Sequence, residues 1–272
     1  MFINDFEAIG YALAALHSDS ATTGAECKLD QEESLQSLHS APVISSAPIA
    51  CIGAGTGLGN CFCCPFDRDD GRGGKAVAHG VFCSEGGMTD TFSPRTEEEW
   101  GLKKWLMAKH GEYVEIERIV SGPGLADVAR YIASTVDDEA GAAAAVVAEL
   151  DATEPDAQAA VVSRHALSAD GQGVARDVCW RALTIFLRTY GREVGAAAQR
   201  FMSFGGLYIA GGILPKVLNE ETKAIFVGAF LDQGPKMSET VSKVPLTLIT
   251  SEDSGLKGAL FKALTVLSSS AQ

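Results

Sequence analysis

Apolar side chains along this chain recur at two spacings, which predict alternating helices and strands. Apolar positions three and four residues apart, or the turn residues before a segment, predict helices at residues 4–16, 97–109, 125–133, 174–201 and 258–267. Short apolar runs at residues 48–51, 76–82, 207–210 and 244–250 are typical of buried strands. Asp5 comes just ahead of the first apolar run, where its carboxylate could cap the helix. This alternation predicts an α/β fold without internal repeats.

The most distinctive local pattern is a run of alternating glycines at residues 53–59, directly after the apolar residues 48–51. Glycine leaves backbone N–H groups uncovered, and Thr56 adds a hydroxyl beside them, so the run suits a phosphate oxygen. A glycine-rich turn between two strands gives the same pattern. On this segment alone, both interpretations stand.

Three polar stretches separate the predicted elements. Residues 18–48 are rich in Ser, Thr and acidic residues, which is typical of a loop. The Cys-rich and Gly-rich residues 60–74 predict a mobile hairpin connection. Residues 131–163 carry seven acidic residues and no Lys or Arg, which indicates a solvated helical or loop insertion rather than a site.

The charge balance excludes some classes of partner. With a formal net charge of −13 over 272 residues, the chain is not expected to bind nucleic acid or an anionic membrane. No window has the length and apolarity of a transmembrane helix, and residues 1–16 lack the basic start of a signal peptide. The seven cysteines are therefore expected to be reduced thiols in a cytoplasmic protein. Cys61, Cys63 and Cys64 lack the paired CxxC spacing of a zinc site, which favours buried thiols and no bound metal.

Five motifs together resemble the bacterial-type glucokinase family, in its order and approximate spacing over nearly the whole chain. They are Asn4-Asp5, the glycine run 53–59, Ser84-Glu85-Gly86-Gly87, residues 117–124 and Ala210-Gly211-Gly212-Ile213. The resemblance implies the actin-like ATPase (ribonuclease H-like) fold, in which two α/β domains flank a cleft that closes on sugar and ATP. It divides the chain into a small-domain remnant with a polar linker (1–44), a large α/β domain (45–250) and a helix returning to the small domain (251–272).

The resemblance also implies roles for individual residues in moving the γ-phosphoryl group of ATP to a sugar hydroxyl. Asp5 matches the catalytic base, with the plain alternative that it only caps the first helix. Asn4, Glu85 and Glu117 match the sugar-binding residues, and the alternative for the two glutamates is an ordinary surface position. The nucleotide-binding residues that it implies are Gly55, Thr56, Gly57, Gly211 and Gly212. Mg²⁺ is expected to accompany ATP.

Two departures from the family pattern bear on these expectations. Met88 stands where the family has a histidine, and methionine cannot donate a hydrogen bond to a sugar hydroxyl. The family's Asp-x-Gly-Gly-Thr hairpin for phosphate and Mg²⁺ is not found before Phe2, so the small domain is expected to be mostly absent and ATP to bind weakly. The apolar faces of residues 1–16 and 256–267 would then pack poorly and favour association, for instance as a homodimer.

Three hypotheses about function follow from these residues. The first is a cytoplasmic glucokinase of glycolysis, with glucose and ATP as its partners. The second is a sugar-binding or regulatory relative with impaired catalysis, which Met88 and the missing hairpin favour. The third is a kinase for another hexose, such as mannose or an amino sugar.

Overall fold

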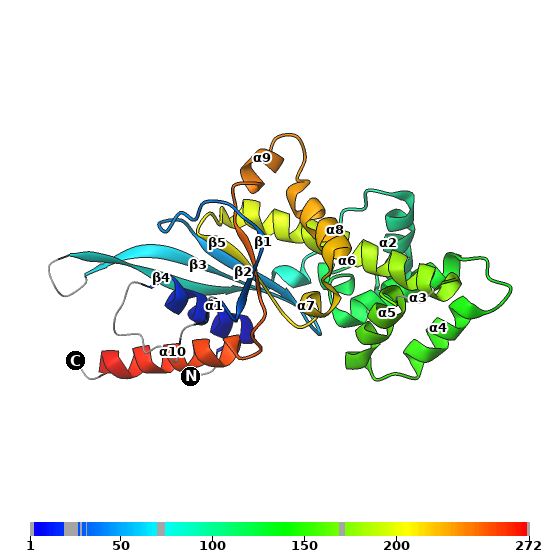
Figure 1. Cartoon of the computed structure of the whole chain (residues 1–272), viewed down its shortest axis with the longest axis horizontal. Helices are drawn as coiled ribbons and strands as arrows, with labels where there is room; N and C mark the ends of the chain where they lie inside the picture. The colour runs from blue at the N-terminus through cyan, green and yellow to red at the C-terminus, as the bar shows by residue number, and fades with distance from the viewer. Residues whose placement is uncertain are drawn as a thin grey trace.

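A mixed β-sheet forms one half of the molecule (Figure 1). The computed structural model describes residues 3–18, 27, 29–30, 32–69, 74–168 and 172–270. Its strands are β1 (Leu35–His39), β2 (Ile49–Ala54), β3 (Leu58–Asp69), β4 (Lys75–Ser84), β5 (Gly206–Ala210) and β6 (Leu246–Ile249). They lie in the order β1-β6-β5-β2-β3-β4; β2, β5 and β6 are parallel, while β1, β3 and β4 pair antiparallel with their neighbours.

Helices cover both faces of the sheet and form the other half of the molecule. The described helices are α1 (Asp5–Leu16), α2 (Glu97–His110), α3 (Gly122–Thr135), α4 (Ala142–Asp151), α5 (Gln158–Ala166), α6 (Val174–Phe201), α7 (Leu214–Val217), α8 (Glu220–Leu231), α9 (Ser238–Val241) and α10 (Ser254–Ser270). Short 3₁₀ helices are η2 (Gly86–Met88), η3 (Ile116–Arg118) and η4 (Pro155–Ala157). None of these helices is long and apolar enough to cross a membrane. The predicted α/β class is confirmed.

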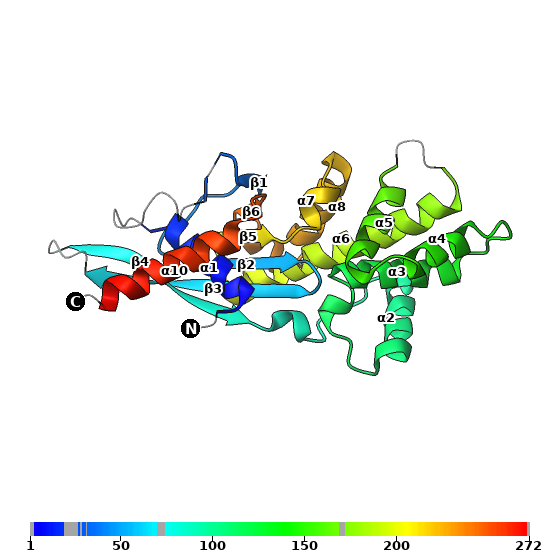
Figure 2. The ribbon, with the colours of Figure 1, turned by 90° about the horizontal axis from the view of Figure 1, so that it is seen from below.

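The central strand β2 is buried on both faces, which explains its continuous apolar sequence. Ala50 and Ile52 belong to the core on the face that α6 covers. Ile49 and Cys51 belong to a second core on the opposite face, together with Leu13 of α1. Figure 2 shows α1 and α10 lying side by side over this second face.

The strongly periodic predictions are confirmed, whereas two loop predictions are wrong. Helix α6 has the predicted bounds, Val174–Phe201. Residues 18–48, expected to be a loop, contain β1, which pairs with β6. Much of 60–74, expected to be a mobile connection, belongs to the long strand β3, although residues 70–73 lie outside the described part. The alternation of this strand was not recognised in the sequence, because cysteines occupy positions where apolar side chains are expected. Cys61 and Cys63 are buried on the face of the sheet that α1 covers, whereas Phe62 stacks on Phe201 on the opposite face.

The predicted buried thiols are confirmed for Cys61 and Cys63, with Cys51 beside them, but the prediction is wrong for Cys64, which is half-buried, and for its neighbour Cys83, which is exposed. Cys27, Cys51, Cys61, Cys63 and Cys179 are buried, while the other two are half-buried or exposed. Burial raises the pKa of the Cys51 and Cys63 thiols well above its ordinary value, which keeps them protonated and unreactive.

The acidic stretch 131–163 is helical, as expected, but it is not merely a solvated insertion. It forms the end of α3 together with α4 and α5. Val146, Leu150 and Val162 from this stretch are buried in the main core. The alanine-rich sequence lets α4 and α5 pack closely against α3 and α6, so the acidic side chains are left on the outer sides.

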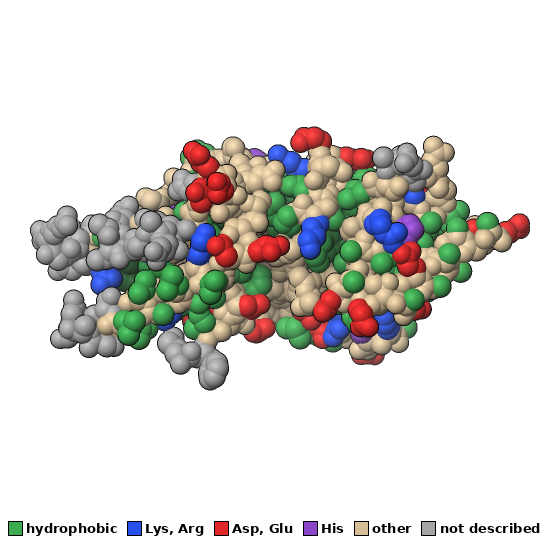
Figure 3. All heavy atoms as spheres, turned by 60° about the horizontal axis from the view of Figure 1, so that its bottom comes forward, with side chains coloured by type: hydrophobic (Ala, Val, Ile, Leu, Met, Phe, Trp, Pro, Cys, Tyr) green, Lys and Arg blue, Asp and Glu red, His purple; other side chains and the backbone are tan. Residues whose placement is uncertain are grey.

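Helices α1 and α10 pack more closely than the sequence indicated. Gly258 makes this contact tight, because a Cβ atom there would overlap the Ala8 carbonyl oxygen. Leu13 is fully buried, and Phe6 and Ile9 pack against its cluster. The exposed apolar side chains lie on the outer side of α10, toward the left in Figure 3. They include Leu256, Leu260 and Leu264.

His17, directly after α1, joins this helical layer to the sheet. Its Nε2 atom lies 2.7 Å from the hydroxyl oxygen of Tyr208. Burial, with a smaller contribution from the charge of His79, lowers the pKa of His17 from 6.5 to about 4. The neutral imidazole is therefore the form that the fold stabilises.

This lowered pKa predicts an acid-sensitive stability. As the pH falls from 6.5 toward 4, the unfolded chain takes up a proton at His17 before the folded chain does, so stability present above pH 6.5 is lost. Between pH 7 and 4 the wild type should lose about 3 kcal/mol more unfolding free energy than His17→Gln. Urea unfolding at both pH values measures the difference. His39→Gln is the control and should follow the wild type; an equal loss in His17→Gln would contradict the prediction.

Candidate functional site

The glycine run forms the turn between β2 and β3, at the carboxyl end of β2. The N–H of Gly55 donates to the carbonyl oxygen of Gly57 at 2.9 Å. The Gly55 carbonyl oxygen accepts from the N–H of Gly122, the first residue of α3, at 2.8 Å. The interpretation of the run as a strand-to-strand turn is therefore confirmed, and Thr56 is exposed at its tip. The phosphate interpretation stays a prediction. The expected open row of amides is shorter than predicted, since Gly55 already uses its N–H.

Glu117 lies directly against this turn. Its Oε2 atom accepts from the N–H of Leu58 at 3.3 Å. The same atom would lie 2.8 Å from a Cβ atom on Gly57, so a side chain there would displace the carboxylate. The short β-branched segment that carries Glu117 forms the 3₁₀ helix η3. Ser121 steadies it by donating its hydroxyl to the Glu117 carbonyl oxygen at 2.6 Å.

Asn4 and Asp5 lie at the start of α1, over the ends of β2 and β3. The capping residue is Asn4, whose Oδ1 accepts from the N–H of Phe6 at 2.8 Å, rather than Asp5 as the sequence suggested. Asp5 accepts from the same N–H at 2.9 Å and is otherwise exposed. The Phe6 ring fills the space over Gly53 and Gly59, where a Cβ atom on either glycine would overlap it. This contact places Asp5 beside the hairpin.

Glu85 reaches the same end of the hairpin from β4. Residue Gly87 lies against the Leu58 carbonyl oxygen, so closely that a Cβ atom would overlap it. A Cβ atom on Gly86 would lie 2.9 Å from Nδ2 of Asn60. Met88 follows with its side chain 45% exposed, which leaves it open to a ligand at this end. The residues that carry the three expected carboxylates, Asp5, Glu85 and Glu117, thus lie near the same end of the β2–β3 hairpin, and the Glu117 carboxylate contacts the turn itself.

Asn60 is a polar residue at this end that the sequence analysis missed. It is only 4% exposed, and its Nδ2 has no hydrogen-bond partner among the described residues. Asn60 pairs with Ser84, the residue before Glu85. The sequence does not single out Asn60, because an asparagine directly after a glycine run is typical of an ordinary turn.

The second glycine turn, after β5, lies beside the first. Gly211 has φ of +90°, and a Cβ atom there would overlap the carbonyl oxygen of Ala54 at the end of β2. Gly212 has open space around it, with Lys216 Nζ at 4.0 Å from its Cβ position. Because β2 and β5 are parallel neighbours, their carboxyl ends meet at one edge, where open α/β sheets bind ligands.

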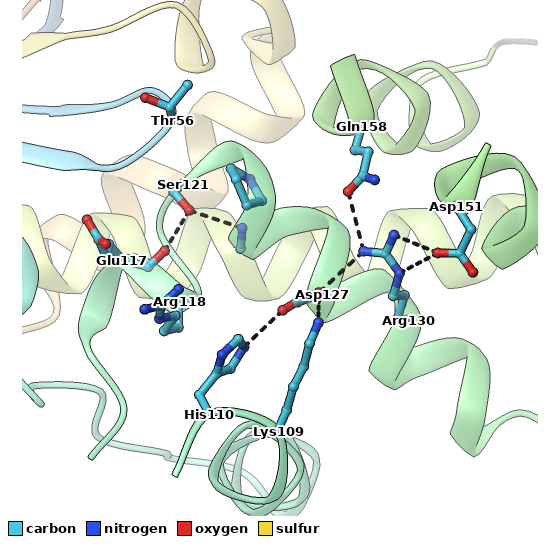
Figure 4. Close-up of a pocket in the computed structure, with 12 residues that line it drawn as sticks. Thr56, Lys109, His110, Glu117, Arg118, Ser121, Asp127, Arg130, Asp151 and Gln158 are labelled. Atoms are coloured by element: carbon cyan, nitrogen blue, oxygen red, sulfur yellow. Dashed lines mark hydrogen bonds and ion pairs between the residues drawn. The ribbon is translucent and has the colours of Figure 1, made fainter. Parts of the chain in front are cut away.

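A pocket of about 450 Å³ opens next to Glu117 on the side of the helices (Figure 4). It is lined by Thr56, Lys109, His110, Glu117, Arg118, Ser121, Pro123, Gly124, Asp127, Arg130, Asp151 and Gln158. Of these residues, only Thr56 and Glu117 are expected at a site from the sequence.

Asp127 is the centre of this pocket's charged cluster. Its carboxylate accepts from Lys109 Nζ at 2.6 Å and Arg130 Nη1 at 3.3 Å, and lies 3.2 Å from His110 Nε2. Arg130 also donates to Asp151 at 2.8 Å. The cluster ties α2 and α4 to α3, the helix whose first N–H holds the glycine turn. Its cations and carboxylates are paired with one another, so it supports the turn rather than attracting a further charge.

Comparisons with known proteins agree with this arrangement. The family model "Glucokinase" matches residues 1–265. A glucokinase of Synechocystis is 34% identical over 264 residues, covering 94% of this chain and 66% of that protein. A glucokinase of Nostoc is 35% identical over 260 residues, covering 94% and 68%. The chain thus spans about two thirds of the length of the curated relatives it matches.

Solved structures show the same fold. A glucokinase from an Antarctic psychrotroph superposes with a TM-score of 0.63 and 26% identity, over 95% of this chain and 66% of that one. A glucokinase of Balamuthia mandrillaris, in complex with glucose, gives a TM-score of 0.66 at 18% identity, over 96% and 64%. The expected actin-like ATPase fold is therefore confirmed.

Proposed function

Because the chain belongs to the glucokinase family, we propose that it phosphorylates glucose to glucose 6-phosphate with ATP. The observation that carries the proposal is the Glu117 carboxylate held against the first glycine turn, with the backbone of Asp5 and Glu85 near the same end of the hairpin and the second glycine turn beside it. Carboxylates and an amide around a shared space can bind a polyhydroxylated ligand, and glycine turns at parallel strand ends suit phosphate groups.

The sugar is proposed to bind between Glu85, Glu117 and Asn4. Each ionised carboxylate oxygen accepts hydrogen bonds from hydroxyl groups, which distinguishes a sugar from water by the placement of its hydroxyls. Oε2 of Glu117 already accepts one N–H from Leu58, which fixes the orientation of the carboxylate before a ligand arrives. The exposed Met88 lies on the Glu85 side and would contribute only apolar contact.

Asp5 is proposed to act as the base in the transfer step. The hydroxyl oxygen of the sugar attacks the γ-phosphorus, its proton passes to the Asp5 carboxylate, and the bond to the β-phosphate oxygen breaks to release ADP. The single N–H that reaches Asp5 from Phe6 holds the side chain in place. The carboxylate is otherwise exposed, so it can approach a bound hydroxyl.

Thr56, Gly55 and Gly57 in the first turn, with Gly211 and Gly212 in the second, are proposed to border the nucleotide phosphates. The Thr56 hydroxyl can donate to a phosphate oxygen, and Gly212 leaves room for one beside Lys216. No three His, Cys, Asp or Glu side chains of the described part lie together as a metal cage. Mg²⁺ is proposed to arrive bound to ATP, where the ion would neutralise phosphate charge.

Replacing Glu117 by glutamine tests the sugar site. The amide oxygen can still accept from Leu58, so the turn should persist, but the loss of charge weakens the bond to a sugar hydroxyl. We expect glucose affinity to fall about tenfold or more, measured by isothermal titration calorimetry. Glu115→Gln, two residues before Glu117, is the matched control; it removes the charge that pairs with Arg118 and should bind glucose like the wild type. Equal affinities for all three proteins would rule out Glu117 as a sugar ligand.

We also propose a cytoplasmic location, because buried free thiols such as Cys51 and Cys61 suit a reducing compartment.

A further inference from the structure

Three cysteines lie side by side across the sheet, in one row on the face that α1 covers. Cys51 of β2 is the register partner of Cys61 of β3, and Cys61 is also the register partner of Cys83 of β4. Register partners on antiparallel strands project their side chains from the same face of a sheet. Cys51 and Cys61 both belong to the core beneath α1, so Cys83 projects from that face as well. None of the three has a part in the site described above.

The row is closed at one end and open at the other. Cys51 is 1% exposed, and burial, with a smaller contribution from Cys61, raises the pKa of its thiol well above the ordinary value. Cys61 is fully buried beneath Gly10 of α1, where a Cβ atom would lie 3.2 Å from the Cys61 sulfur. Cys83 is exposed on β4, the last strand of the described sheet. Of this row, only Cys83 is therefore open to a dissolved oxidant.

The spacing of the outer pair suits a disulfide. Cα atoms of register partners on antiparallel strands are about 4.5 or 5.5 Å apart, within the range of about 4.4–6.8 Å that disulfides span. Their Cβ atoms are about 4.5–5.5 Å apart, whereas those of a disulfide average about 3.8 Å. A bond between Cys61 and Cys83 would therefore draw β3 and β4 together by about 1 Å at this pair.

This pair lies between two segments of the candidate site. Cys83 is two residues before Glu85. Cys61 is two residues after Gly59, the glycine on which the Phe6 ring of α1 rests. A shift of β4 toward β3 at this pair therefore moves the backbone that carries Glu85 relative to the start of α1.

We propose that Cys83 and Cys61 form a reversible disulfide when the protein meets hydrogen peroxide, and that this disulfide weakens glucose binding. First, one peroxide oxygen bonds to the Cys83 sulfur, the O–O bond breaks, and the thiol proton leaves with the other oxygen as water. The Cys61 sulfur then displaces the oxygen on Cys83, which takes the Cys61 proton and leaves as a second water. The two thiols lose two electrons to the peroxide, and a dithiol reductant returns them by thiol–disulfide exchange. Only the effect on glucose rests on the proposed function.

Peptide mapping of the peroxide-treated protein tests the disulfide. Free thiols are alkylated first, and trypsin then releases Cys61 and Cys83 on separate peptides, residues 29–68 and 76–95. We expect these peptides to be joined in the treated wild type and separate after reduction with dithiothreitol. Cys83→Ser and Cys61→Ala should each abolish the link. In Cys61→Ala, Cys83 should remain as a sulfenic acid, which dimedone labels.

Cys64→Ser is the matched control. Cys64 is in the same strand and only half-buried, but its side chain projects from the opposite face. This variant should form the link like the wild type.

Glucose calorimetry on the reduced and oxidised forms tests the effect on binding. We expect about tenfold weaker binding after peroxide treatment, full recovery with dithiothreitol, and no effect of peroxide on Cys83→Ser. Recovery with dithiothreitol also separates this effect from oxidation of the exposed Met88, since a methionine sulfoxide needs its own reductase.

The outcomes separate the inference from the proposed function. A link that persists in Cys61→Ala joins Cys83 to another cysteine and overturns the inference, as does oxidation of Cys83 in the wild type without a link; glucose binding by the reduced protein then still supports the proposed function. A link between Cys61 and Cys83 with unchanged glucose affinity overturns the effect on binding. If the reduced wild type binds no glucose, the proposed function and the effect on affinity are overturned together, and the peptide map alone decides the disulfide.

Discussion

Asp5→Asn is expected to lower the rate of glucose phosphorylation by about 10²- to 10⁴-fold while glucose binding stays measurable. The amide keeps the shape of the side chain and can still accept from the N–H of Phe6, so the start of α1 should be unchanged. It cannot take the proton of the attacking hydroxyl. A coupled dehydrogenase assay for glucose 6-phosphate measures the rate, and calorimetry measures glucose binding.

Glu7→Gln provides the control for Asp5, because it also removes a carboxylate from the first turns of α1. Its effect on the helix dipole is similar, so a purely structural role of the two acids would lower both rates alike. We expect the Glu7 variant to turn over at the wild-type rate. Unchanged turnover in Asp5→Asn would remove Asp5 from the chemistry and leave it only the hydrogen bond that it accepts from the N–H of Phe6.

Gly211→Ala is expected to lower the free energy of unfolding by about 4 kcal/mol and to weaken nucleotide binding. Gly211 has φ of +90°, and a Cβ atom there would overlap the carbonyl oxygen of Ala54, so β2 and β5 would have to separate at their carboxyl ends. Gly212→Ala is a matched control one residue away, since its Cβ position has no neighbour closer than Lys216 Nζ at 4.0 Å.

Urea unfolding of the two variants and the wild type measures the difference. Gly212→Ala should lie within about 1 kcal/mol of the wild type, because neither strain nor overlap arises there. Equal stabilities for the two variants would mean that the close approach of the Gly211 turn to β2 does not hold in solution.

Helices and strands whose sequence pattern is local could be predicted from the sequence alone. Helix α6 repeats its apolar side chains over seven turns, so its bounds, Val174–Phe201, followed from periodicity alone. Strand β5 followed from a short apolar run bounded by glycines. The turn at 55–57 was recognisable from its glycines, and Gly57 leaves the room that the Glu117 carboxylate occupies.

Features that depend on distant segments were not predictable. Strand β1 has only five residues and one buried side chain, and it exists because β6, some two hundred residues later, pairs with it. Asp127 is an acidic residue among the buried residues of α3. Nothing in the sequence reveals that Lys109 and His110 of α2 reach its carboxylate. The contact of α1 with α10 is equally non-local.

The candidate site was predictable to an intermediate degree. Its glycine turns were visible in the sequence, whereas the roles of Asp5, Glu85 and Glu117 came from the resemblance to a family, because an isolated acid next to a turn is common on any surface. The structure brings all three to one hairpin end, yet their roles in binding and catalysis remain our proposal.

The most direct test of the central claim is ³¹P NMR of the protein incubated with glucose and Mg-ATP at millimolar concentrations. We predict that glucose 6-phosphate and ADP appear slowly, because ATP is expected to bind weakly, and in equal amounts. We also predict that no ADP forms when glucose is left out, and that Asp5→Asn forms neither product above the blank. Glucose that binds but is never phosphorylated, or ADP that forms together with free phosphate instead of glucose 6-phosphate, would contradict the claim.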